Sequence, residues 1–122
     1  MSGTRPVLLA AAREFNAGRF FEAHEVLEDG LEDADGEHWD LLLGLIQIAV
    51  GYHKASQGLG SGALLMLDKG LLKAAPFPAD AGGLELEELR RSVAADVARL
   101  RRGEAVEPPR LRFTPGRGGE AS

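Results

Sequence analysis

The sequence predicts an all-α fold, a compact bundle of about five helices made of two helical hairpins and a C-terminal helix. Apolar residues recur three or four positions apart along most of the chain, which is the period of a helix packed on one side. No stretch alternates apolar and polar residues long enough to indicate a strand. Gly and Pro gather at a few points that divide the chain into segments of helical length.

The first hairpin is predicted before residue 35. Pro6 suits the first turn of a helix, and an apolar stripe follows it until the Asn16-Ala17-Gly18 break. A second helix should run from about Arg19 to Ala34. We expect Asp35 to cap the helix that comes next.

The next three helices are predicted over residues 39–57, 63–73 and 84–102. The first of them is apolar on nearly every side, so it should be the central, most buried element. Ser61 is expected to cap the following helix. The last carries arginines in its final turns, where the helix dipole favours positive charge.

A weak repeat at an offset of 40 residues aligns two glycine turns, each followed by a helix with small and apolar residues in one row. The aligned residues are Gly18, Ala23, Leu27 and Leu31 with Gly58, Ala63, Leu67 and Leu71. Two such units are too few for an open helical array. A closed bundle is therefore expected, with the central helix shared by both hairpins.

Residues 1–102 should form the single helical domain, and residues 103–122 a non-helical C-terminal tail. Pro and Gly recur in this tail and prevent a helix. Leu111 and Phe113 give it apolar side chains with which to dock, so we expect an extended segment strapped across the bundle.

Composition excludes several classes of function. The chain has no Cys, which removes disulfides, thiolate metal sites and a cysteine nucleophile. Residues 1–53 carry ten carboxylates against three arginines, and residues 54–122 carry nine against eleven Lys and Arg. The net charge of −5 disfavours nucleic acid as a partner. The uneven charge indicates either solvated faces on opposite helices or attraction between the two halves, within or between chains.

The chain is expected to be cytoplasmic and without a membrane-spanning segment. No secretory signal is readable at the N-terminus. The longest apolar run, Leu41–Ala49, is interrupted by Gly44 and Gln47 and is about half the length that a span requires. A homodimer is also expected, because 44% of the residues are hydrophobic in so short a chain.

The candidate site follows the Asn/Gly break. His24 and Glu28 lie one helical turn apart, so their side chains can meet. Gln47 and His53 lie in the apolar central helix, where a buried amide needs hydrogen-bond partners. We therefore expect a polar cluster of His24, Glu28, Gln47 and His53 between the second and third helices. Trp39 and Tyr52 are expected in the core rather than in a stacking platform.

This cluster supports three interpretations. It could be a hydrogen-bonded structural lock between helices. It could instead hold a single divalent metal ion through His24, Glu28 and His53, although no Glu-x-x-His motif of di-metal bundles is present. It could also be a metal-free acid/base or ligand-binding site. No phosphate-binding loop, dinucleotide fingerprint or G-x-S-x-G motif is found.

The residues resemble a known family, the small helical prokaryotic proteins of domain of unknown function 309 (DUF309). The resemblance covers roughly residues 7–75 and rests on Phe15-Asn16-x-Gly18-x-Phe20-x-Glu22-Ala23-His24-Glu25-x-Leu27-Glu28, Gly44-Leu45-Ile46-Gln47-x-Ala49, His53 and Gly62-Ala63. This chain has Leu31 and Leu43 where the family usually carries Trp and often carries Gln. The resemblance implies an all-helical protein with no established activity. Its signature residues map onto His24, Glu25, Glu28, Gln47 and His53.

The predicted function is a binding or interaction module with an unknown protein or small-molecule partner. Its binding residues would be His24, Glu25, Glu28, Gln47 and His53. No cofactor is predicted. The alternative is a small metal-dependent or acid/base enzyme, of hydrolase type, that uses His24, Glu28 and His53.

Overall fold

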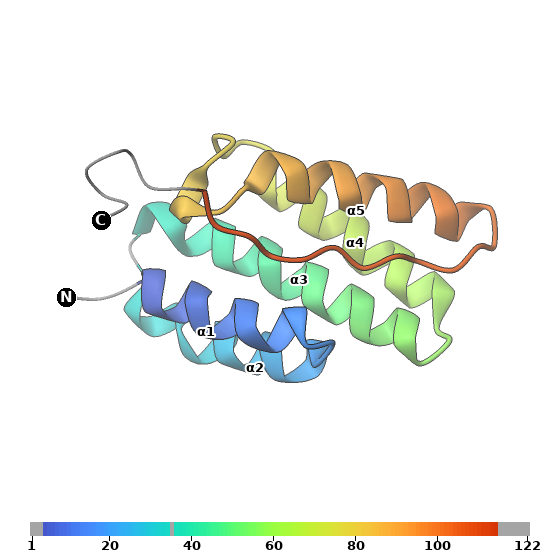
Figure 1. Ribbon diagram of the computed structural model, residues 1–122, viewed down its shortest axis with the longest axis horizontal. Coiled ribbons are helices and arrows are strands. Elements are labelled where there is room, and N and C mark those ends of the chain that lie inside the picture. Colours follow the sequence, from blue (N-terminus) through green and yellow to red (C-terminus); the bar gives the residue numbers. More distant parts are fainter. Residues whose placement is uncertain (1–3, 35, 115–122) are drawn as a thin grey trace.

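A computed structural model describes residues 4–34 and 36–114 of the 122-residue chain. Five α-helices follow one another, α1 (Thr4–Asn16), α2 (Phe20–Asp29), α3 (Trp39–Ser56), α4 (Gly60–Ala74) and α5 (Leu86–Arg101) (Figure 1). Three short 3₁₀ helices, η1 (Leu31–Asp33), η2 (Gly36–His38) and η3 (Ala81–Gly83), lie between them. The described residues contain no strand, and the predicted all-α class is confirmed.

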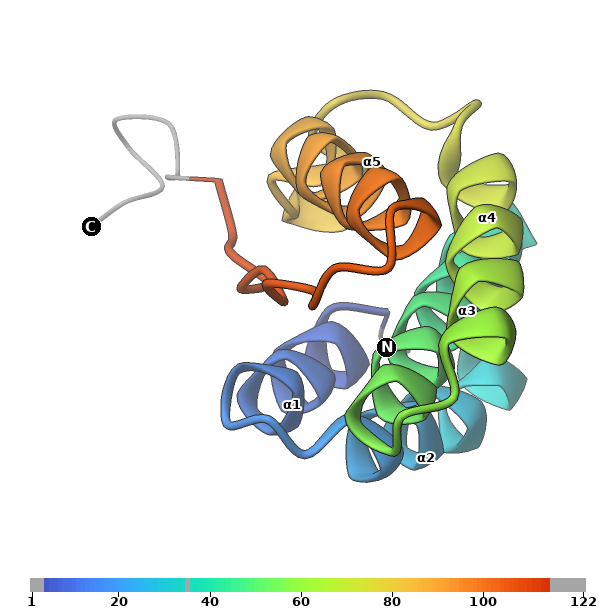
Figure 2. The ribbon, with the colours of Figure 1, turned by 90° about the vertical axis from the view of Figure 1, so that its right-hand side faces the viewer.

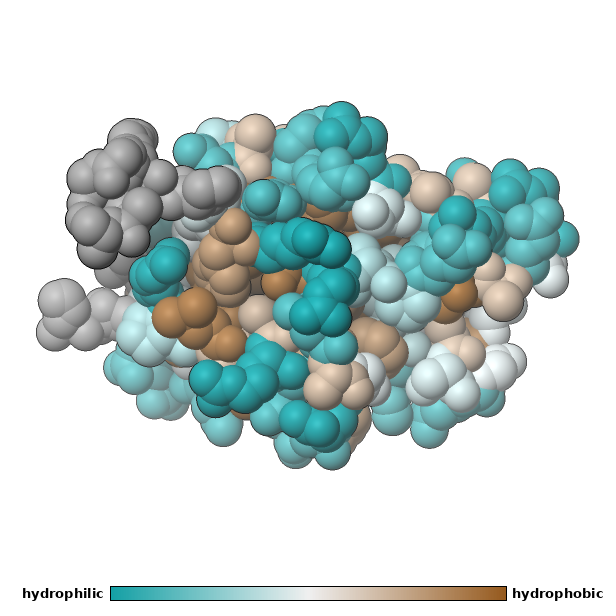
Figure 3. All heavy atoms as spheres, viewed as in Figure 1, coloured by the Kyte–Doolittle hydropathy of each residue, from teal (hydrophilic) through white to brown (hydrophobic). Residues whose placement is uncertain are grey.

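The helices lie in two layers. α2, α3 and α4 lie side by side in one layer with α3 in the middle, and α1 and α5 form the other (Figure 2). The segment 104–114, which we call the strap, runs between α1 and α5 and closes the space between them (Figures 1 and 3). We call the other side of the α2–α3–α4 layer, which points away from α1, α5 and the strap, the outer face.

The two hairpins each turn at a glycine, and the two turns have the same backbone conformation. The predicted repeat is confirmed at these turns. Gly18 and Gly58 have positive φ angles of 82° and 78°. Each sits in the turn that ends a helix, where left-handed backbone favours Gly. The residues that follow, Arg19 and Leu59, have closely similar φ and ψ, −92° and 74° against −95° and 71°. The same local chemistry therefore reverses the chain twice.

The second helix is shorter than the sequence predicts. α2 ends at Asp29 instead of Ala34, and η1 continues after Gly30. A Cβ on Gly30 would lie 2.5 Å from the Cγ2 atom of Val7. The close contact with α1 requires Gly at this point, and Gly weakens a helix. The predicted cap Asp35 lies outside the described residues.

The fourth helix begins earlier than predicted, and Ser61 does not cap it. α4 starts at Gly60, Leu59 occupies the cap position, and no side chain there donates or accepts a capping hydrogen bond. The positive φ of Gly58 directs the chain into the helix at once. Gly62 then lies inside the helix, where its missing side chain leaves room for the stem of Lys54.

The contact between α3 and α4 is made through glycines. A Cβ on Gly70 would lie 2.9 Å from the carbonyl oxygen of Gly44, and a Cβ on Gly51 would lie 2.6 Å from Cδ2 of Leu67. The two backbones therefore approach closely without intervening side chains. α3 is the central helix as predicted, and Tyr52 is 1% exposed. Trp39 was expected in the core but is 43% exposed, because it is the first residue of α3 at the end of the layer.

The strap is fastened at three places. The backbone N–H of Glu107 donates to Asp96 at 2.8 Å. The amide of Asn16 pairs with the backbone of Leu111 in both directions, at 2.7 Å and 3.0 Å. Phe113 forms an isolated antiparallel bridge with Leu84. The sequence had predicted that the last helix begins at Leu84, but α5 begins at Leu86 and Leu84 lies outside it.

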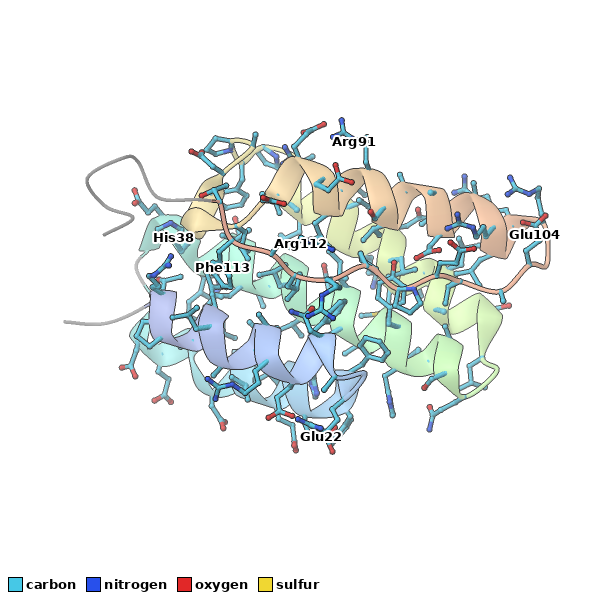
Figure 4. The ribbon with its side chains drawn as sticks, in the orientation of Figure 1. Glu22, His38, Arg91, Glu104, Arg112 and Phe113 are labelled. Carbon is cyan, nitrogen blue, oxygen red and sulfur yellow. The ribbon has the colours of Figure 1, made fainter. Side chains whose placement is uncertain are left out.

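Apolar contacts reinforce the strap. Leu111 is 5% exposed within the core. The guanidinium of Arg5 lies 5.2 Å from the ring centre of Phe113, which occupies the space between the strap and α1 (Figure 4). The division of the chain into a domain ending at residue 102 and a separate tail stays a prediction, and residues 115–122 of that tail lie outside the described residues.

Replacing Gly70 with Ala should destabilise the fold. The new Cβ would meet the Gly44 carbonyl oxygen, a backbone atom that can move only with its helix. We expect the free energy of unfolding to fall by about 1–3 kcal/mol, although Ala favours a helix over Gly by about 1 kcal/mol. Gly60→Ala in the same helix meets nothing within 4 Å and should leave stability equal or higher. Urea unfolding checks both variants, and an equal response would contradict the close-packing explanation.

Candidate functional site

A small pocket lies between α2 and α3 on the outer face. Its volume is about 270 Å³, and we call it the Phe21 pocket. The lining residues are Phe21, His24, Val50, His53, Lys54 and Gln57. The pocket is lined by both histidines that the sequence singled out, His24 from α2 and His53 from α3.

Phe21 is in contact with both imidazoles. Its ring centre lies 5.3 Å from the ring of His24 and 5.3 Å from the ring of His53, with tilts of 53° and 50°. Such separations are typical of favourable aromatic contacts. Phe21 nevertheless remains 45% exposed, so a fixed apolar ring faces solvent at this point.

His24 and Glu28 form the predicted pair. The Nε2 atom of His24 lies 3.3 Å from a carboxylate oxygen of Glu28, and Nδ1 lies 3.3 Å from the backbone carbonyl oxygen of Phe21. Both partners accept hydrogen bonds, and a neutral imidazole can donate to only one of them. Because the Glu28 side chain is 56% exposed, the pair adds little stability.

Among the described residues, the side chains of Gln47 and His53 form no hydrogen bond with the other members of the predicted four-residue cluster. Gln47 does not join His24 or Glu28, and its Oε1 atom is buried without a hydrogen-bond partner in the part of the chain that the structure describes. Gln47 and His53 are six residues apart, so they point about 120° apart around α3. His53 contacts the ring of Phe21.

The predicted metal ligands are not brought together. Within residues 4–34 and 36–114, no group of three His, Asp or Glu side chains is placed to hold a metal ion. The benzyl ring of Phe21 contacts the imidazoles of both His24 and His53. The arrangement of His24, Glu28 and His53 therefore does not fit the metal interpretation.

Residues 8–66 match the family model described as domain of unknown function (DUF309). These residues belong to the DUF309 family. The predicted resemblance is thereby confirmed, and the family is uncharacterised. No curated protein matches the chain. Within the described ranges, no helix has both the length and the apolar character needed to cross a membrane.

The DUF309 match includes every residue that lines the Phe21 pocket and leaves out α5 and the strap. The side chains that carry the family resemblance therefore lie in the α2–α3–α4 layer and α1. The cytoplasmic location stays a prediction.

Sequence analysis missed the polar centre of the protein, which is Asp96. Its carboxylate is 0% exposed and accepts hydrogen bonds from the Tyr52 hydroxyl at 2.5 Å, Arg99 at 2.6 Å and the Glu107 backbone at 2.8 Å. The signal was available, because Asp96 interrupts the apolar stripe formed by Val93 and its neighbours. This centre links α3, α5 and the strap, and its donors satisfy the buried charge.

His24→Ala and Asp96→Ala should differ strongly in stability. The first removes an ion pair with an exposed partner, so we expect a loss below about 1 kcal/mol in the free energy of unfolding. The second leaves the Tyr52 hydroxyl and two further donors unpaired, so we expect a loss of about 3 kcal/mol or more. Chemical denaturation measures both. A larger loss for His24→Ala would restore the structural-lock interpretation.

Stability should fall at alkaline pH because of Tyr52. Burial, followed by the hydrogen bond to Asp96, raises the pKa of Tyr52 in the folded protein. Tyr52 in the unfolded chain ionises near pH 10, so the unfolded state loses this proton first. The contribution is fully present below about pH 10 and decreases by about 1.4 kcal/mol per pH unit above it.

The measurement is simple because Tyr52 is the only Tyr of the chain. Tyrosinate absorbance should therefore appear only together with unfolding. The control is Tyr52→Phe, which should lose the steep alkaline decrease. Tyrosinate absorbance in the folded protein near pH 10 would show that the burial explanation is incorrect.

Proposed function

We propose that the protein acts by binding a partner, and that the binding surface is the outer face centred on the Phe21 pocket. The observation that carries the proposal is the ring of Phe21, which contacts two imidazoles and is yet 45% exposed. An aromatic side chain that is already ordered costs little further entropy when a partner covers it. Aromatic side chains of this kind are common anchors of interfaces.

The size and lining of the pocket support binding over enclosed catalysis. A volume of about 270 Å³ is below the range of roughly 300–1,000 Å³ that is usual for small-molecule sites. It is large enough for one inserted side chain. Val50 supplies an apolar wall, and Lys54 and Gln57 supply polar groups at the rim, which is the usual arrangement at an interface.

The alternative enzyme, with His24, Glu28 and His53 in acid/base roles, draws less support from the geometry. Both ring nitrogens of His24 already face acceptors. The imidazole of His53 forms no hydrogen bond with either of them and contacts the ring of Phe21. A nucleophile or general base is usually oriented by a second group within hydrogen-bond reach, and the three residues do not form such a relay.

Photo-crosslinking inside the cells that express the protein tests the binding surface. Phe21→benzoylphenylalanine places a photoreactive ring in the pocket, and the same replacement of Leu9 is the matched control. Leu9 is 43% exposed, close to Phe21, but lies on α1 in the other layer. We expect a discrete adduct from the Phe21 position and none from Leu9. Equal adducts from both positions, or none from either, would overturn the proposal.

A further inference from the structure

The outer face is negative along α2. No Lys or Arg occurs between Phe20 and His53, so nothing in this segment offsets its acidic residues. Glu28 extends from the same side of α2 as His24, which lines the Phe21 pocket, and Glu25 lies one turn before it. Glu25 forms no ion pair among the described residues, and Glu28 contacts only His24.

The outer face is positive along α4. A Cβ on Gly44 of α3 would lie 3.3 Å from Cβ of Lys73, which places Lys73 beside α3. Lys69 lies one turn earlier on α4 and shares its side. Neither lysine forms an ion pair in the parts of the chain that the structure describes. The only acidic residue of α4, Asp68, pairs with Arg101 of α5.

The charges of α5 are satisfied within the chain. The arginines of α5 and the residue after it pair with acids of the C-terminal half: Arg90 with Glu87, Arg91 with Glu88, Arg99 with Asp96, Arg101 with Asp68 and Arg102 with Glu104. Figure 4 shows why they do not reach the N-terminal acids, since Arg91 and Glu22 project from opposite edges of the molecule. The acids of α2 and the lysines of α4 therefore remain for another molecule.

A strip of partly buried side chains separates the two charged edges. Leu43, Gln47 and Val50 follow one another along α3 at helical spacing and are each half-buried. Phe21 and Lys54 continue this strip at the α2 side and at the end of α3. The face thus has a partly buried centre, in which Leu43, Val50 and Phe21 are apolar and Gln47 and Lys54 are polar, between an acidic edge and a basic edge.

We propose that a second copy of this chain covers the outer face, with the acidic edge of each copy against the lysine edge of the other. A symmetric dimer has its twofold axis in the plane of the interface. An axis across the helices would place α2 on α2 and oppose like charges. An axis parallel to α3 places α2 of each copy over α4 of the other. This rotation keeps each residue at its own level along α3, so it brings the acidic edge at Glu28 nearest to Lys69 of the other copy.

The available area suits a reversible dimer. α3 has 18 residues and is therefore about 27 Å long, and two helix spacings give a width of about 20 Å. The footprint is roughly 500 Å² per copy before side-chain relief is counted, at the lower end of specific interfaces. The dimer should therefore dissociate on dilution and weaken with salt, because its ion pairs lie at the rim.

This inference rests on the proposed function, since it names the partner that the same face binds. Two variants with reversed charges test it. One carries Glu25→Lys and Glu28→Lys, and the other carries Lys69→Glu and Lys73→Glu. In each variant, like charges meet at both edges of the symmetric interface. The dissociation constant of the dimer, measured by sedimentation velocity, should therefore rise roughly 100-fold.

Mixing the two variants provides the decisive measurement. In the mixed dimer every edge again meets its opposite charge, so association should return to the wild-type level. The control, Asp80→Lys with Glu88→Lys, changes the same amount of charge near the end of the strap and should leave the dimer intact. Circular dichroism confirms that each variant is folded.

The outcomes separate this proposal from the function on which it rests. A wild-type chain that stays monomeric at about 0.2 mM, a concentration far above the micromolar range of weak dimers, overturns the second copy. So does a dimer that the reversals leave unchanged, or one that mixing fails to restore. If the Phe21 adduct then has the mass of another protein, the binding function still holds. An adduct of twice the chain's mass, lost in both reversed variants, supports both proposals.

Discussion

The close approach of α3 and α4 is the constraint on which the rest of the structure depends. Gly44 and Gly70 face each other where the two helices meet. Further along α3, Gly51 leaves room for the side chain of Leu67. Because no Cβ intervenes, the two backbones pack directly and dispersion contacts replace side-chain interdigitation. α3 is thereby held in the middle of a three-helix layer. It must bury one side against α1, α5 and the strap, and its remaining side becomes the outer face (Figure 2).

The two sides of that layer are stabilised in different ways. On the covered side, Asp96 joins α3, α5 and the strap through hydrogen bonds from three separate elements, and Asn16 fixes the strap to α1. The arginines of α5 form ion pairs with acidic residues in the C-terminal half of the chain. On the outer side there is no comparable polar centre among the described residues. The DUF309 match covers α1 and most of the three-helix layer and ends before α5.

This asymmetry explains why binding is the better interpretation of the outer face. The histidine and carboxylate pattern that suggested chemistry is present, but Phe21 contacts both imidazoles, no group of three potential metal ligands forms among the described residues, and the Glu28 side chain faces solvent. What remains on the face is an ordered aromatic ring, a partly buried strip and two edges of opposite charge. Such a surface is complementary to itself under one choice of twofold axis and repulsive under the other. In the dimer that we propose, electrostatics selects the orientation of the two copies, which hydrophobic burial alone does not do.

The sequence by itself determined the class, the number of helices and the two glycine turns, because helical periodicity and positive φ are local properties of the chain. It also identified α3 as the central helix, since a segment that is apolar all round must be buried. Tertiary structure decided the rest. α2 ends at Asp29 because Gly30 meets Val7 of another helix. Gln47 is separated from His24 because the partners of a buried side chain depend on how two helices pack. Asp96 became the polar centre because its donors come from residues 44 and 11 positions away as well as from its own helix, and no local pattern encodes such distant contacts.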